Sequence, residues 1–116
     1  GGVKMKVFIF SCNNVFLNEY MSFILNDTKA IEAWVSPITN TAIIISQLSV
    51  SDLSAVLHGR LGETWFILVE ASPSNTNGWL PGNFWEYISN PHSIVQNNYL
   101  SKLFSDQQSK GLLNNQ

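Results

Sequence analysis

Short apolar runs and longer amphipathic stretches alternate along this chain, with polar turns between them. β-branched and aromatic residues, which favour strands, gather in four of the runs, at residues 7–10, 31–35, 42–45 and 64–69. Apolar residues at helical spacing predict helices over residues 15–25 and 50–61. The predicted order is therefore strand, helix, strand, strand, helix, strand.

Polar residues at the ends of the two stretches indicate where the helices begin and end. Asn13 or Asn14 is expected to cap the first helix, which ends near residues 26–27. Ser49 is placed to cap the second helix, with Asp52 in its first turn, and Gly62 is placed to end it.

This order predicts a ferredoxin-like βαββαβ sandwich, in which two helices cover one face of a four-stranded antiparallel sheet. Residues 36–40 are short enough to form a hairpin between the second and third strands. Ile31, Ala33 and Val35 are expected on one face of the second strand, with Trp34 on the other. The uncovered sheet face, with Trp34 and Trp65 as candidate members, needs a cover, which dimerisation or the C-terminal segment would supply.

The last third of the chain is expected to form a short helical extension. Pro81 cannot lie inside a helix, but Asn83 is placed to cap a short one that carries Phe84, Trp85 and Ile88. Residues 5–90 are predicted to form the domain, and residues 91–116 a polar extension that is partly helical and then mobile from about residue 105. Met5 is interpreted as the natural start, and residues 1–4 as an artificial leader.

The composition favours association with other proteins. Charged residues make up 12% of the chain and the net charge is −2, so the surface has little charge to oppose self-association. A homodimer or a higher homo-oligomer, and a further protein partner, are therefore expected. The six basic residues are scattered, which makes nucleic acid a weakly supported partner, because nucleic-acid binding relies on clustered cations.

The sequence is also typical of a cytoplasmic protein. Cys12 is its only cysteine, which suits a reducing compartment. No run reaches the ~20 apolar residues that cross a bilayer, so no membrane association is expected. No cofactor and no metal are expected either, since no paired metal-ligand spacing occurs.

Residues 41–46, 48–61 and 64–70, followed by Gly78-Trp79-Leu80-Pro81 and Phe84-Trp85, resemble the SinR-like relatives of the CRISPR adaptation protein Cas2. The resemblance spans roughly residues 5–88, and the Gly-Trp-Leu-Pro turn is its specific part. It implies a ferredoxin-like fold, a homodimer, and a role in nucleic-acid metabolism or antiviral defence. It also implies that nuclease activity would need an Asp after the first strand. Uncharged residues occupy those positions, so Asn13 and Asn14 are interpreted as a degenerate metal corner.

The aromatic cluster after the last strand is the most unusual candidate site. Trp79, Phe84 and Trp85, with Leu80 and Pro81 beside them, would either cap the open end of the sheet or anchor an interface, where Trp is enriched. Other reactive residues have ordinary interpretations. Cys12 is a reasonable nucleophile with His58 as its base, but it is more typical of a small buried hydrophobe, and His58 of a surface residue.

The sequence therefore favours a non-catalytic, Cas2-like dimeric binding or structural module, and two alternatives stay open. One is a metal-dependent nuclease whose carboxylates come from elsewhere, such as Glu70 or Asp52. The other is a sensor that binds a nucleotide or metabolite between protomers.

Overall fold

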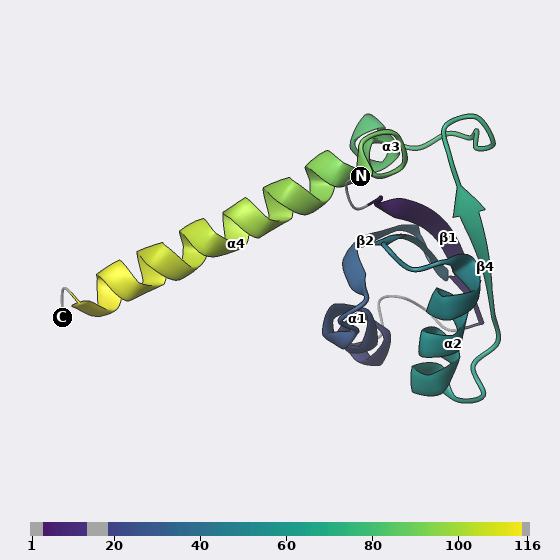
Figure 1. The fold of residues 1–116 in the computed structure, drawn as a ribbon, viewed down its shortest axis with the longest axis horizontal. Coiled ribbons are helices and arrows are strands. Elements are labelled where there is room, and N and C mark those ends of the chain that lie inside the picture. The colour runs from purple at the N-terminus through teal and green to yellow at the C-terminus, as the bar shows by residue number, and fades with distance from the viewer. Residues whose placement is uncertain (1–3, 14–18, 115–116) are drawn as a thin grey trace.

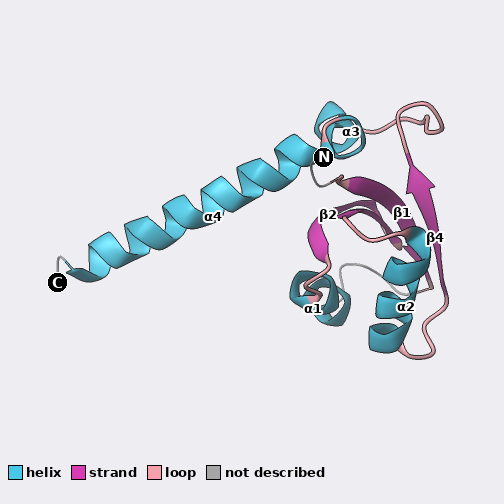
Figure 2. Cartoon of the chain, viewed as in Figure 1, coloured by secondary structure: helices cyan, strands magenta, loops and turns pink. Residues whose placement is uncertain are grey.

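The computed structural model describes residues 4–13 and 19–114, and only the backbone of residues 104–114. Strands and helices follow one another as β1 (Lys6–Cys12), α1 (Glu19–Asp27), β2 (Ile31–Ile38), β3 (Thr41–Ser46), α2 (Val50–Leu61), β4 (Phe66–Ala71), α3 (Gly82–Ser89) and α4 (Pro91–Asn114). The expected order of strands and helices is confirmed up to β4 (Figures 1 and 2).

The strands form one four-stranded sheet in the order β2-β3-β1-β4, and every neighbouring pair is antiparallel. The predicted hairpin joins β2 and β3, and Asn40 adopts a positive φ of 73° in its turn. Each of α1 and α2 connects two strands that are separated in the sheet by one other strand. The chain is thus an α+β protein whose β2 and β4 form the two edges of the sheet.

The first face of the sheet packs against α1 and α2. Alternate residues of the central strands, such as Phe8 and Ile44, are fully buried there beneath apolar residues of both helices. The caps predicted for α2 are present: the Ser49 hydroxyl accepts a hydrogen bond from the Asp52 N–H, and Gly62 ends the helix with a φ of 60°. This face holds the main core, because the central strands bury alternate side chains in it, while Phe66 and Leu68 of β4 pack partly buried at its margin.

The second face of the sheet is covered in part by α3 and by the first turns of α4. Ile88 of α3 is buried against Val7, Ala33, Ile43 and Ile45. Phe84 and Trp85 of α3, and Ile94 and Val95 of α4, pack at the margin of this cluster. Of the two covers expected for this face, dimerisation or the C-terminal segment, the C-terminal segment therefore supplies at least part. Asn83 lies inside α3 rather than at its start, because the helix begins at Gly82 after Pro81.

Two expectations for β2 are wrong. Ile31 packs on the first face, whereas Ala33 and Val35 pack on the second, because a register shift between Ile31 and Ala33 moves Ile31 to the opposite side. Trp34 lies on the helix-covered first face, not on the uncovered one, and its indole N–H donates to the Asn26 side chain over 2.8 Å. The strand also continues through Pro37, which an edge strand tolerates.

Beyond its first turns, α4 extends away from the body of the protein (Figure 1). It is helical to Asn114, further than the sequence indicates, and Tyr99, Leu100 and Leu103 are exposed along it.

Candidate functional site

An apolar groove lies on the second face of the sheet, where α3 stops covering it. Its floor is formed by Ile9, Ile38 and Ile43, and its wall by Leu80 and Trp85. The groove has a volume of about 300 Å³. The remaining lining residues are Pro37, Thr41, Asn75, Thr76, Asn77 and Ile88. None of these side chains is charged, so the groove is suited to apolar groups with a few hydrogen-bonding partners at its rim.

A second apolar surface adjoins this groove on β4. Ile67 and Val69 are 64% and 50% exposed, and Trp65, just before the strand, is 79% exposed. Val69 lies directly opposite Ile9 of the groove in the β1–β4 register, so the two surfaces are continuous. We call Trp65, Ile67 and Val69 the β4 patch. Soluble proteins rarely leave such contiguous apolar surface uncovered without a use for it.

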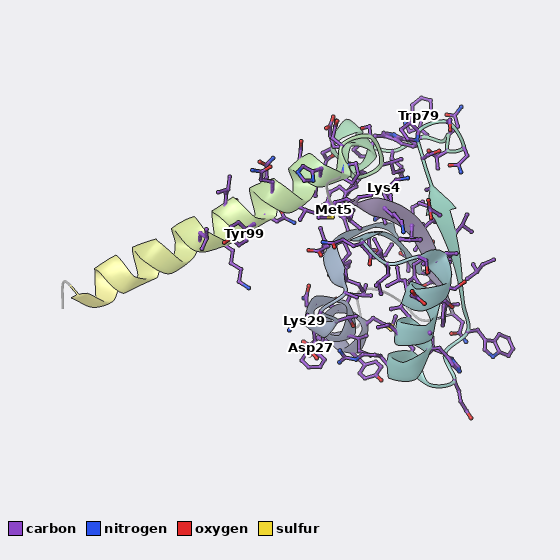
Figure 3. All side chains as sticks on the ribbon, in the orientation of Figure 1. Lys4, Met5, Asp27, Lys29, Trp79 and Tyr99 are labelled. Atoms are coloured by element: carbon purple, nitrogen blue, oxygen red, sulfur yellow. The ribbon has the colours of Figure 1, made fainter. Side chains whose placement is uncertain are left out.

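The aromatic residues after β4 were expected either to cap the sheet or to anchor an interface, and different members are placed for each role. Phe84 and Trp85 cap the sheet: both are partly buried, and the Trp85 indole N–H donates to the Leu80 carbonyl over 3.2 Å. Trp79 is 97% exposed and projects from the loop away from the body of the protein (Figure 3). Pro81 is exposed at the start of α3. Trp79 thus stabilises no core, and its ring is open to a partner near the groove wall at Leu80.

The corner after β1 is fixed by Asn13. Its N–H donates to the Trp65 carbonyl over 3.1 Å, and its side-chain oxygen accepts from the Trp65 N–H over 3.2 Å. Cys12 is half-buried against the first-face core. Asn14 lies outside the described residues. Asn13 therefore has a structural role, in which its amide oxygen already has a donor.

The acidic and histidine residues are not brought together within the described part of the chain, where no three His, Cys, Asp or Glu side chains lie close enough to hold a metal ion. Glu63, Glu70, Asp52 and His58 are all exposed. His58 lines a hollow between α2 and β4, beside Ser51, Ser54 and Ala55.

Comparison with protein-family models, with curated proteins and with solved structures finds no significant match to this chain. Across residues 4–13 and 19–114, no helix has both the length and the apolarity that crossing a bilayer requires.

Sequence reasoning missed Ile38, Ile67 and Val69 as surface residues. An apolar run on both faces of a strand is typical of a strand covered on both faces, and only the placement of α3 shows which part stays open. Trp65 was expected on the uncovered sheet face and Trp79 in the aromatic cluster after the last strand, and both are exposed.

Proposed function

We propose that this chain is a non-catalytic, Cas2-like binding module that holds a protein partner on the uncovered part of its sheet. The observation that carries the proposal is the continuity of the apolar groove with the β4 patch. The groove offers Ile38, which is 54% exposed, and the patch offers Ile67 and Val69 beside it. Trp79 adds an aromatic anchor next to the groove wall, and such residues dominate the binding energy of protein interfaces.

The strand order supports the ferredoxin-like part of the proposal. Counted from the β4 edge, the sheet runs β4-β1-β3-β2, with each of α1 and α2 crossing over one intervening strand. Two interleaved split-βαβ units would give the same order. A homodimer and a link to antiviral defence belong to the same proposal and rest on the resemblance at Gly78-Trp79-Leu80-Pro81.

The chemistry of the surface favours a protein over a nucleic acid. No cation lines the groove, and the β4 patch itself consists of apolar residues. A nucleic acid would need clustered Lys or Arg to replace its counterions. A protein segment with apolar side chains needs only a desolvated, uncharged surface of this kind.

Site-specific photo-crosslinking in cells tests the partner. A photoreactive residue replaces Trp79, and a matched control carries it at Asn97 on the exposed side of α4. We expect a defined protein adduct from position 79, none from position 97, and loss of the adduct when Ile38→Lys places a charge in the groove. An adduct that survives Ile38→Lys would contradict binding through the groove.

Activity assays address the two alternatives. RNA and DNA, single- and double-stranded, are incubated with the purified chain and Mg²⁺ or Mn²⁺, and thermal stability is measured with nucleotides and metabolites. We expect no cleavage above that of buffer and no ligand-dependent rise in melting temperature. Metal-dependent cleavage that Asp52→Asn or Glu70→Gln abolishes would replace this proposal with a nuclease, and a stabilising ligand would replace it with a sensor.

A further inference from the structure

The two edges of the sheet are protected to different extents. On β2, Pro37 and two register shifts disrupt regular pairing, and α4 runs close to the strand. On β4, residues 66–71 include no Pro, Gly or Lys, and Glu70 is their only charge. Natural sheets protect exposed edges with such disruptions and charges because an unprotected edge pairs with another strand. The β4 edge is therefore ready to accept a strand.

The backbone groups that β4 offers can be assigned from its pairing with β1. The Trp65 N–H and carbonyl both point toward Asn13. These backbone directions alternate along an antiparallel strand. The N–H and carbonyl groups of Ile67, Val69 and Ala71 therefore also point toward β1, and those of Phe66, Leu68 and Glu70 point outward. Among the described residues, the one contact to these outward groups is from the Asn75 side-chain amide to the Glu70 carbonyl, at 3.5 Å.

We propose that the strand which pairs with this edge is β4 of a second copy of the chain, antiparallel, about a two-fold axis at Leu68. In that register Leu68 faces its own mate, and Phe66 and Glu70 face each other. All three outward residues then fall in hydrogen-bonded pairs, which exchange both backbone bonds. The same patch serves both copies, as a two-fold interface requires.

The side chains in this register are compatible with one another. Ile67 lies opposite the mate of Val69 on the second face, so that two exposed apolar side chains contact each other side by side. Glu70 lies opposite Phe66 and not opposite another carboxylate, so no like charges are opposed. The hollow between α2 and β4, of about 610 Å³, is lined by Ser51, Ser54 and Ala55 and carries no acidic or strongly basic residue.

The area of the contact decides how strong the pairing should be. Two short paired strands alone bury less than the roughly 1,200–2,000 Å² of a standard stable interface. The hollow beside α2 supplies further surface, because its small side chains let the two α2 helices approach across the junction. We therefore expect a reversible dimer and not an obligate one.

The homodimer itself rests on the proposed function, and what the pairing adds is its interface: the β4 edge, the register at Leu68 and the residues that face each other there. Pairing joins two β4 patches into one apolar strip with a groove on either side, which doubles the surface available to a protein partner. Failure of the crosslinking experiment at Trp79 would leave the dimer intact, and a monomer in solution would leave the groove intact.

The molar mass in solution tests the dimer. Sedimentation equilibrium on the full chain over roughly 1 µM to 1 mM, a range that covers weak interfaces, should give a mass that rises from 13.0 kDa toward twice that value. Ile67→Lys with Val69→Lys places two cations opposite each other in the proposed register and should give a monomer. Ile67→Lys with Val69→Glu places opposite charges there and should restore the dimer.

A matched control places two lysines on α4, at Tyr99 and Leu103, both of which are exposed. This variant should dimerise as the wild type does, and circular dichroism should show that all the variants fold. A wild type that stays at 13.0 kDa throughout, or a dimer that only the α4 variant disrupts, would overturn the proposal. A Lys–Glu pair that fails to restore the dimer while the Lys–Lys pair abolishes it would overturn the register at Leu68.

Discussion

Asn13 and Trp65 bond to each other in both directions across the ends of β1 and β4. The Asn13 N–H donates to the Trp65 carbonyl, and the Asn13 side-chain oxygen accepts from the Trp65 N–H. Asn13, which the sequence analysis interpreted as part of a degenerate metal corner, therefore joins two neighbouring strands. It sets where β4 begins, and with it which backbone groups of that edge face outward.

Replacing Asn13 by Ala should lower the free energy of unfolding by about 1 kcal/mol, because it removes the acceptor for the Trp65 N–H. Asn13→Asp keeps an acceptor and should cost less than Asn13→Ala. Urea unfolding monitored by Trp fluorescence measures both, with the exposed Asn97→Ala as a control expected within about 0.5 kcal/mol of wild type. An Asn13→Ala variant as stable as wild type would show that this hydrogen bond contributes nothing.

Trp79 and Trp85 form a matched pair of aromatic residues, of which only Trp85 is predicted to contribute to stability. Trp85→Ala removes a ring that packs on the second face of the sheet and a hydrogen bond to Leu80, so it should cost about 2–4 kcal/mol. Trp79→Ala removes a ring that is almost fully in solvent and should change stability by less than about 0.5 kcal/mol. Thermal and urea unfolding check both, and a large loss in Trp79→Ala would assign that ring to the core.

Local signals explain why much of the fold could be predicted. The Ser49 cap and the end of α2 at Gly62 depend on residues within a few positions, and both are present. The apolar runs also located every strand. These features are fixed by short-range geometry, which a single sequence carries.

Features that depend on residues far apart in the chain could not be predicted from the sequence. The register shift that moves Ile31 to the first face arises where β2 pairs with β3, and alternation within β2 cannot reveal it. Similarly, Ile67 and Val69 are exposed because α3 covers the other end of the sheet face. The candidate site could be predicted at Trp79 and Trp65 but not at Ile67 and Val69, since the burial of those two side chains is decided by a segment that follows β4 in the chain.

Gly59 and Gly62 allow a comparison of two glycines only three positions apart. Gly62 ends α2 at a φ of 60°, which residues with a side chain rarely adopt, so Gly62→Ala should cost about 1 kcal/mol although nothing crowds the position. Gly59 lies within α2 with open space around it, so Gly59→Ala should add about 0.5–1 kcal/mol through helix propensity. Melting temperatures moving in the same direction for both variants would contradict this account.

Ser46 supports the turn between β3 and α2 from a fully buried position. Its hydroxyl donates to the Ala30 carbonyl over 2.7 Å and accepts from the Leu48 N–H over 3.2 Å, so it joins the start of β2 to the segment before α2. Ser46→Ala leaves both backbone groups without this partner and should lower the free energy of unfolding by about 1–3 kcal/mol.

The control for Ser46 is Ser51→Ala, an exposed position on α2 where alanine is the better helix former. It should leave stability unchanged or slightly raised in the same urea titration. Hydrogen exchange adds a local measurement, because the Leu48 amide should lose protection in Ser46→Ala and keep it in Ser51→Ala. A Leu48 amide equally protected in both variants would show that another group holds this turn, and that the buried hydroxyl of Ser46 is dispensable.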